Sequence, residues 1–232
     1  MTAIDTHSQL LSDLGKLEEA LPLRRESLRV KRESLGDRHP DTLLSVNNLA
    51  VLLNELGRST ANPNMLREAE PLKREALAGC REVLGNRHPH TLASIANLAD
   101  MLMQLSHIDP RALMEAEPLC REALAGSREV LGDGHPDTLK SAGNLAALLV
   151  DLSRYIADDA TAMKCLKEAE PLYVEAIAGF TKGVGSTHPS TLAYVSEYAR
   201  LLLELGKPKE AENTQKDSFC LLYTSPSPRD GL

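Results

Sequence analysis

The chain has 232 residues, of which 42% are apolar and 25% charged, with a net charge of −7. This composition is typical of a soluble globular protein of one or two domains. The acidic balance leaves no basic surface for a phosphate backbone, and no stretch approaches the roughly eighteen apolar residues of a membrane span. We therefore expect neither nucleic acid nor a membrane as a partner. The first residues lack a basic start followed by an apolar run, which favours a cytoplasmic protein.

One nine-residue phrase occurs four times and divides the chain into units. Its copies are LGDRHPDTL at 35–43, LGNRHPHTL at 84–92, LGDGHPDTL at 131–139 and VGSTHPSTL at 184–192. The small residue that ends the next apolar segment lies 18 residues after each His, and each Glu-Ala alanine lies 19 residues before the next His. All length variation falls between these marks, so the unit has 42 residues, with insertions of 7, 5 and 11. Variation at one fixed point indicates a surface loop in a repeat protein.

Each unit contains two amphipathic segments, which we predict to be helices. After His39, apolar side chains recur every three or four residues from Leu43 to Leu56, and the same offsets return in each later unit. The second segment has a similar pattern and stops at Gly85 in the second unit, a residue suited to a helix C-terminus. Such helices bury their apolar faces by stacking on neighbouring units. The sequence therefore predicts an all-α solenoid of ten helices without strands, in five units at about 1–35, 36–84, 85–131, 132–183 and 184–219.

The repeated phrase is interpreted as the joint between two units. Gly ends one helix, and Pro40 begins the next, where its missing amide proton costs nothing. His39 and Asp41 lie where side chains can cap free backbone amides. Four histidines at equivalent corners could also form a row of metal ligands, but successive units would place them roughly 10 Å apart. That is too far to share an ion bound at about 2 Å, so we expect no metal and no other cofactor.

These units resemble the tetratricopeptide repeats of the kinesin light chain type, which read HPDTxLxNNLAxLxxxLGxxxEAEPLxREALxxxxLG, from about residue 4 to residue 219. The resemblance implies a right-handed superhelix of helix pairs, whose first helices line a concave groove for extended or partly helical peptides. No coiled-coil segment precedes the repeats, so a kinesin light chain itself is not indicated.

The resemblance assigns groove asparagines and one second-helix position. The asparagines correspond to Asn48, Asn97 and Asn144, whereas the first and fifth units carry Thr6 and Glu197 instead. The aromatic residue usual in the second helix is retained as Tyr173 and replaced elsewhere by Arg24, Lys73 and Cys120.

The insertions and the first unit depart from the pattern. Asn62, Asp109 and Asp158 can cap extra turns at the start of the second helices. The prolines of the EAEPL segments then fall inside these helices and should kink or break them: Pro71, Pro118 and Pro171. An alternative function for the lengthened corners is a binding edge. The opening helix has His7 and Ser8 at core positions, so we expect a frayed cap or the remnant of a longer chain.

Residues 220–232 have no place in the unit. The eleven residues from Cys220 to Asp230 resemble the translation of a transposase-type sequencing adapter, and a Pro/Ser linker is the alternative. We therefore expect a non-native tail that packs on nothing.

The sequence predicts a binding protein and not an enzyme, because it contains no nucleophile with a base, no metal cluster and no phosphate-binding loop. We expect a scaffold that binds peptide segments of partner proteins in the groove. The alternatives are a regulatory or sensor arm of a larger nucleotide-switch or kinase protein, and a purely structural stack.

The inner face of the first helices indicates the kind of peptide. Positions 5, 8, 9, 12, 15 and 16 after each His hold seven acidic and two basic side chains: Asp5, Asp13, Glu55, Asp100, Asp151, Glu197, Glu204, Lys140 and Arg200. This charge should attract a basic peptide with apolar anchors, which would pack near Val51, Met103, Val150 and Leu203. The expected peptide contacts are Asn48, Asn54, Asn97, Asn144, Asp100, Met103, Asp151, Glu197 and Arg200. The asparagines could instead bond only neighbouring helices.

Overall fold

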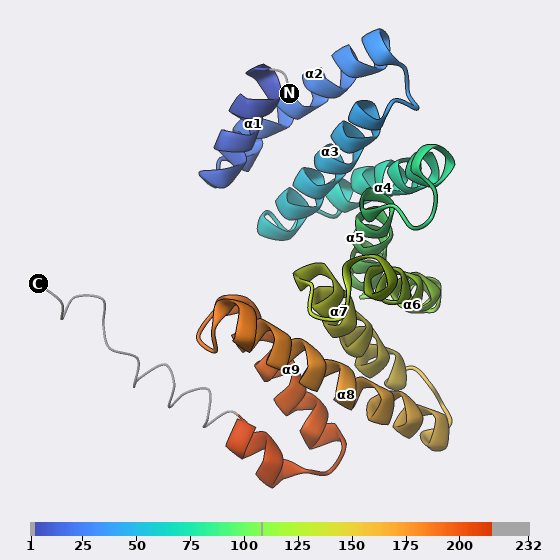
Figure 1. The fold of residues 1–232 in the computed structure, drawn as a ribbon, viewed down its shortest axis with the longest axis vertical. Coiled ribbons are helices and arrows are strands. Elements are labelled where there is room, and N and C mark those ends of the chain that lie inside the picture. Colours follow the sequence, from blue (N-terminus) through green and yellow to red (C-terminus); the bar gives the residue numbers. More distant parts are fainter. Residues whose placement is uncertain (1–2, 108, 215–232) are drawn as a thin grey trace, which may run out of the picture. The chain divides into compact units, whose positions relative to one another are not determined.

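The computed structural model describes residues 3–107 and 109–214, and within these ranges it contains helices and no strand (Figure 1). The helices are α1 (Ala3–Asp13), α2 (Leu17–Leu35), α3 (Pro40–Ser59), α4 (Pro63–Leu84), α5 (Pro89–Leu105), α6 (Arg111–Leu131), α7 (Pro136–Ser153), α8 (Asp159–Val184) and α9 (Pro189–Glu204). Residues 208–214 form a further helical segment. The prediction of an all-α chain of helix pairs is confirmed. The predicted tail at 220–232 lies outside the described residues.

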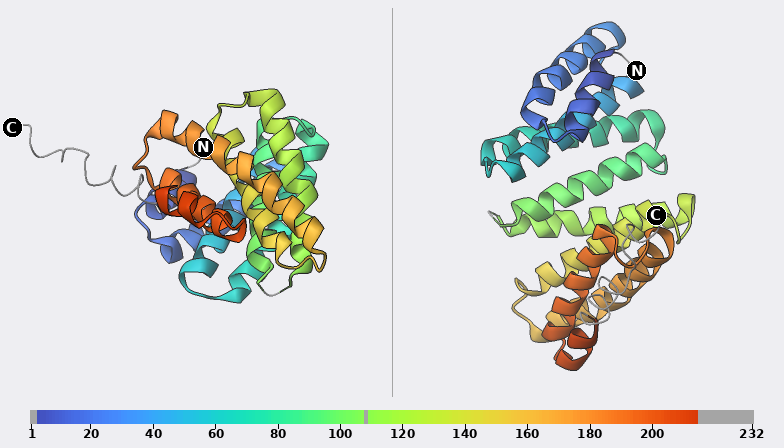
Figure 2. Two further views of the ribbon diagram at one scale, coloured as in Figure 1. Left: turned by 90° about the horizontal axis from the view of Figure 1, so that it is seen from below. Right: turned by 90° about the vertical axis from the view of Figure 1, so that its left-hand side faces the viewer.

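The helices belong to two compact units, Met1–Leu105 and Ser106–Leu232. In unit 1, α2 packs against α1 and α3, and α4 packs against α3 and α5. In unit 2, α7 packs against α6 and α8, and α8 packs against α9. These neighbour contacts can be followed from two further sides in Figure 2. Within each unit, the helices thus bury their apolar faces against the helices next to them in the chain, as a stack of repeats requires.

The joints have the predicted caps. Nδ1 of His39 accepts a hydrogen bond from the backbone amide of Asp41 at 3.2 Å, and His88, His135 and His188 make the same bond at their helix starts. The glycines that end the second helices have φ between 82° and 97°, a region open to glycine: Gly36, Gly85, Gly132 and Gly185. The capping interpretation of the histidines is confirmed.

The insertions lengthen the second helices at their starts, as expected. Oδ1 of Asn62 accepts the amide of Asn64 at 3.0 Å, and Oδ2 of Asp158 accepts the amide of Thr161 at 2.8 Å. Oδ1 of Asp109 accepts the amide of Arg111 at 3.0 Å, although α6 itself begins at Arg111. Each lengthened helix therefore begins with a polar cap of its own.

These prolines were expected to kink or break their helices, and the expectation of a break is wrong. Helices α4, α6 and α8 run without interruption through Pro71, Pro118 and Pro171, and α2 does the same through Pro22. All four prolines are exposed. The carbonyl that loses its amide partner therefore lies on the solvent side, where water can replace the missing bond.

Ion pairs connect successive second helices at the same repeat positions in both units. Arg25 and Arg32 of α2 bind Glu68 and Glu75 of α4 at 2.7 and 2.6 Å. In unit 2, arginines of α6 bind glutamates of α8, each at 2.5 Å: Arg121 with Glu168 and Arg128 with Glu175. Such exposed pairs contribute at most about 1 kcal/mol each. Their recurrence shows that the second helices pack in the same register in both units.

Glycine allows the two helices of a pair to approach closely. A Cβ at Gly79 of α4 would lie 2.9 Å from Cδ1 of Leu43 in α3, and closer still to its Cδ2. Gly179 of α8 faces Leu139 of α7 in the same way. Since both leucines are buried, a larger residue at either glycine would push the first helix away from the second.

Candidate functional site

The predicted binding residues form two sets, one in each unit. The set in unit 1 lies on α3 and α5: Asn48, Asn54, Asn97, Asp100 and Met103. The set in unit 2 lies on α7 and α9: Asn144, Asp151, Glu197 and Arg200. Arg200 is exposed, and all but one of the other side chains are half-buried. We call these surfaces of the first helices, together with that of α1, the first-helix faces.

Two residues predicted on this surface are buried. Asn54 is 7% exposed and Val150 is 1% exposed. Both occupy the fifteenth position after the joint histidine, where Met103 is half-buried and Leu203 is 56% exposed. The side chains of Asn54 and Val150 therefore contribute to packing, while Met103 and Leu203 are accessible to an apolar anchor.

Asn97 bonds a neighbouring helix in unit 1. Its Nδ2 donates a hydrogen bond to Oδ1 of Asn47 in α3 at 3.1 Å. This is the kind of bond between neighbouring helices that was expected from the sequence as the alternative to peptide binding by the asparagines. From the other side, Nζ of Lys73 in α4 donates to the backbone oxygen of Asn97 at 2.9 Å. Lys73 is 3% exposed, so a buried ammonium supports this part of the first-helix face from below.

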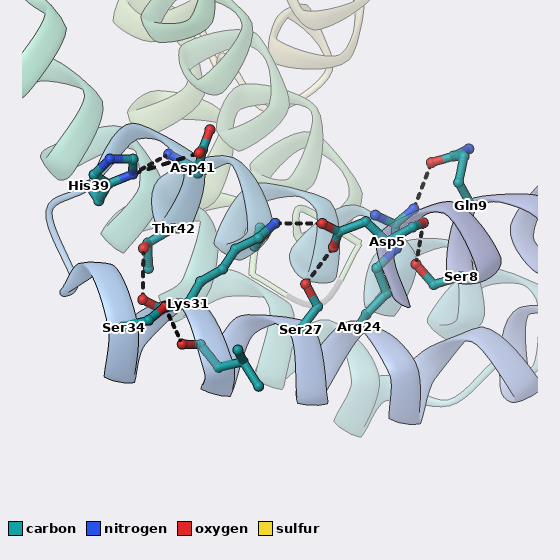
Figure 3. A network of polar contacts seen from close by, with 12 residues as sticks. Asp5, Ser8, Gln9, Arg24, Ser27, Lys31, Ser34, His39, Asp41 and Thr42 are labelled. Carbon is teal, nitrogen blue, oxygen red and sulfur yellow. Dashed lines mark hydrogen bonds and ion pairs between the residues drawn. The ribbon is translucent and has the colours of Figure 1, made fainter. Parts of the chain in front are cut away.

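A polar network joins α1 to α2 and, through Lys31, to α3 (Figure 3). The carboxylate of Asp5 accepts hydrogen bonds from the hydroxyl of Ser27 and, at 2.9 Å, from Nζ of Lys31. Lys31 also donates to Oγ of Ser45 in α3 at 2.7 Å. Nη2 of Arg24 donates to Oε1 of Gln9 at 2.7 Å, and burial lowers the pKa of this guanidinium while Asp5 and Asp13 raise it. The opening helix is therefore held by these polar contacts together with the apolar packing of Leu11.

The cations of the second helices are the part of the site that sequence reasoning missed. Arg24 and Lys73 are buried next to first-helix groups, whereas the charge count at the sequence level included only the first helices. The signal was present, because these residues replace an aromatic side chain of the repeat pattern. A basic residue at a core position must place its charge against a polar partner, and here the partners lie on the first-helix face.

Carboxylates and arginines alternate on the first-helix face of unit 2. Arg154 binds Oδ1 of Asp151 at 2.7 Å and Oε1 of Glu204 at 2.6 Å. Glu197 binds Arg200, one turn further along α9, at 2.5 Å. The pKa of Arg154 is raised, first by its hydrogen bond to Glu204 and further by the charges of Asp151 and Glu197. Three carboxylates thus share two guanidinium groups.

Tyr173 is buried on α8, the helix that packs against both α7 and α9 in unit 2. Its side chain is 0% exposed, and its hydroxyl has no hydrogen-bond partner among the described residues. The pKa of Tyr173 is raised well above its ordinary value, mainly by burial and next by the charge of Glu197, with a smaller contribution from Asp151. The charge of Arg200 acts in the opposite direction. The negative charges of Glu197 and Asp151 thus add to burial in disfavouring ionisation of this hydroxyl.

A cavity of about 260 Å³ lies in unit 1 at the starts of α3 and α5. Its lining includes Asn47, Cys80 and Ser94, and burial raises the pKa of the Cys80 thiol. The equivalent residues of unit 2 are Gly143, Phe180 and Tyr194. There the rings of Phe180 and Tyr194 stack at a centroid distance of 5.4 Å, and Tyr194 lies directly against Gly143. Aromatic rings therefore fill in unit 2 the space that is open in unit 1.

Comparison with known proteins identifies the repeats. Two tetratricopeptide repeat family models match the chain, one over residues 2–61 and the other over 42–90 and 112–137. Among curated protein sequences, none matches the chain.

Three solved structures have the same fold. One is a structure of TPR-like repeats from Podosopora anserina that are nearly identical to one another and are assigned to a kinesin light chain. Its sequence is 24% identical to this chain, the TM-score is 0.72, and the match covers 97% of this chain and 96% of that chain. A single-substitution variant of those repeats is 25% identical with a TM-score of 0.71, covering 94% and 92%. BtubC (BKLC) from P. vanneervenii is 20% identical with a TM-score of 0.72, covering 99% and 84%.

Within 3–107 and 109–214, no three His, Cys, Asp or Glu side chains come together as metal ligands. Across those residues, no helix combines the length and the hydropathy that crossing a membrane requires.

Proposed function

Because this chain is built of tetratricopeptide repeats, we propose that it is a scaffold that binds peptide segments of partner proteins on its first-helix faces. The observation that carries the proposal is the asparagine row: Asn48, Asn97 and Asn144 are half-buried at one repeat position of successive first helices. A carboxamide both donates and accepts hydrogen bonds, so it suits a peptide backbone whatever its side chains.

The charge of the faces favours a basic peptide. Acidic side chains outnumber basic ones on the first helices, and the additional cations Arg24 and Lys73 are buried against partners of their own. Electrostatic attraction of this kind mainly raises the association rate and weakens with salt. The half-buried Met103 and the exposed Leu203 offer contacts for apolar side chains of the ligand.

A structural stack is the second candidate, because Asn97 already bonds Asn47. Asn97→Ala distinguishes the two functions. For a peptide selected from a random library, the variant should lose roughly 1–3 kcal/mol of binding free energy, the cost of leaving a backbone group unpaired. Asn64→Ala, at an exposed position of α4, is the matched control and should bind as the parent does.

Calorimetric titration measures the peptide affinity of both variants, and thermal unfolding measures their stability. If Asn97→Ala lowers stability and leaves peptide affinity unchanged, the asparagines serve packing alone. If the library returns acidic sequences, the assignment of a basic ligand is refuted.

A further inference from the structure

The second-helix position of Tyr173 holds a cation in unit 1. The equivalent residues there are Arg24 and Lys73, both buried and both directed at first-helix groups. The ammonium of Lys73 donates a hydrogen bond to the backbone oxygen of Asn97 at 2.9 Å. In unit 2 the corresponding pairs are Cys120 with Asn144 and Tyr173 with Glu197. The second of these pairs has a carboxylate at the asparagine position, and a neutral hydroxyl at the position of the ammonium.

The groups around Tyr173 are suited to a cation from outside. Asp151, Glu197 and Glu204 carry one more charge than Arg154 and Arg200 neutralise. The Tyr173 hydroxyl is fully buried and has no hydrogen-bond partner among the described residues, which is rare for a buried polar group. A hydroxyl and two carboxylates are acceptors, and an ammonium has three protons to donate.

We propose that the first-helix face of unit 2 contains a binding site for a lysine side chain of the ligand, formed by Asp151, Glu197 and Tyr173. This inference rests on the proposed function and specifies the residue that the bound segment must present. The ammonium takes the place of the exposed guanidinium of Arg200 at Glu197, and by displacing that side chain it reaches the hydroxyl below. It thus supplies in unit 2 the charge that Lys73 supplies in unit 1.

The probe is Nα-acetyl-lysine methylamide, with the norleucine analogue as a matched control that lacks only the ammonium. In a nitrogen-15 NMR titration of the full chain, the lysine compound should shift the backbone amides around Asp151, Tyr173 and Glu197, and the norleucine compound should not. Glu197→Gln should weaken binding of the lysine compound about tenfold. Asp133→Asn, an exposed loop carboxylate before α7, should leave it unchanged.

Two further variants separate binding from folding. Tyr173→Phe removes a hydroxyl that has no partner, so it should leave the melting temperature unchanged or raise it, while binding weakens severalfold. Arg200→Ala removes the competing guanidinium and should strengthen binding.

The outcomes for the lysine site and for peptide binding are distinct. If the lysine compound shifts no amide of α7, α8 or α9, or if Glu197→Gln and Tyr173→Phe both bind it like the parent, the lysine site is refuted, and library peptides that depend on Asn97 still support the proposed function. If the lysine compound binds as described but no library peptide binds, the proposed function fails and with it the assignment of the ligand as a peptide.

Discussion

Replacing Gly79 with alanine should destabilise unit 1, although alanine is the better helix former. The new Cβ would lie 2.9 Å from Cδ1 of Leu43 and closer to Cδ2, and Leu43 is 1% exposed, so it cannot move aside into solvent. Overpacking of this kind costs about 1–3 kcal/mol, and the gain in helix propensity offsets up to about 1 kcal/mol. We expect a net loss of about 1 kcal/mol in the free energy of unfolding.

Gly183 of α8 is the matched control for this substitution. It lies within a helix, and a Cβ there would meet no atom within 4 Å. Gly183→Ala should therefore raise the free energy of unfolding by up to about 1 kcal/mol. Urea unfolding followed by circular dichroism measures both changes, and amide hydrogen exchange shows whether α3 and α4 carry the loss. If both variants are stabilised alike, the close approach of Gly79 and Leu43 does not limit packing.

Two further predictions concern the caps. His39→Ala removes the Nδ1 acceptor at the start of α3 and should lower the free energy of unfolding by roughly 0.5–2 kcal/mol. The control His107→Ala, at an exposed turn, should have no effect. Equal melting temperatures of the two variants would contradict the capping role of His39. Asp158 has a pKa below its ordinary value, mainly because its carboxylate accepts hydrogen bonds from the side chain and the amide of Thr161. The stabilisation by this carboxylate is therefore complete above the ordinary pKa of an aspartate, and it is lost as the pH falls through the lower pKa of the folded state. Asp158→Ala should thus be less stable than the parent at neutral pH and equally stable in strong acid. A stability difference that persists unchanged into strong acid would show that another interaction of Asp158 matters.

The joints were predictable from the sequence because their physics is local. His39 caps an amide two residues away, and Gly85 needs only its own backbone conformation, so neither depends on the neighbouring helix. The uninterrupted helices at the prolines were not predictable in this way, because a proline in the sequence does not show on which side of the helix the hydrogen bond is lost. Pro71 faces solvent, and a carbonyl there retains water as a partner.

Burial at the candidate site could not be predicted in the same way. Asn54, Val150 and Leu203 occupy one repeat position with one periodicity, yet Leu203 is 56% exposed and the other two are buried. Helical periodicity gives the direction of a side chain on its own helix. How closely the next helix approaches depends on residues many positions away, and a single offset carries no information about them.

The second helices place different side chains at equivalent repeat positions next to the first helices. At one repeat position, Lys31 binds Asp5 and Ser45, Cys80 lines an open cavity, and Phe180 stacks on Tyr194. The asparagine row is suited to a peptide backbone and cannot by itself distinguish one sequence from another. On the proposed function, selectivity must therefore come from the side chains that the second helices place beneath the face. The lysine site proposed at Tyr173 is one case of this rule.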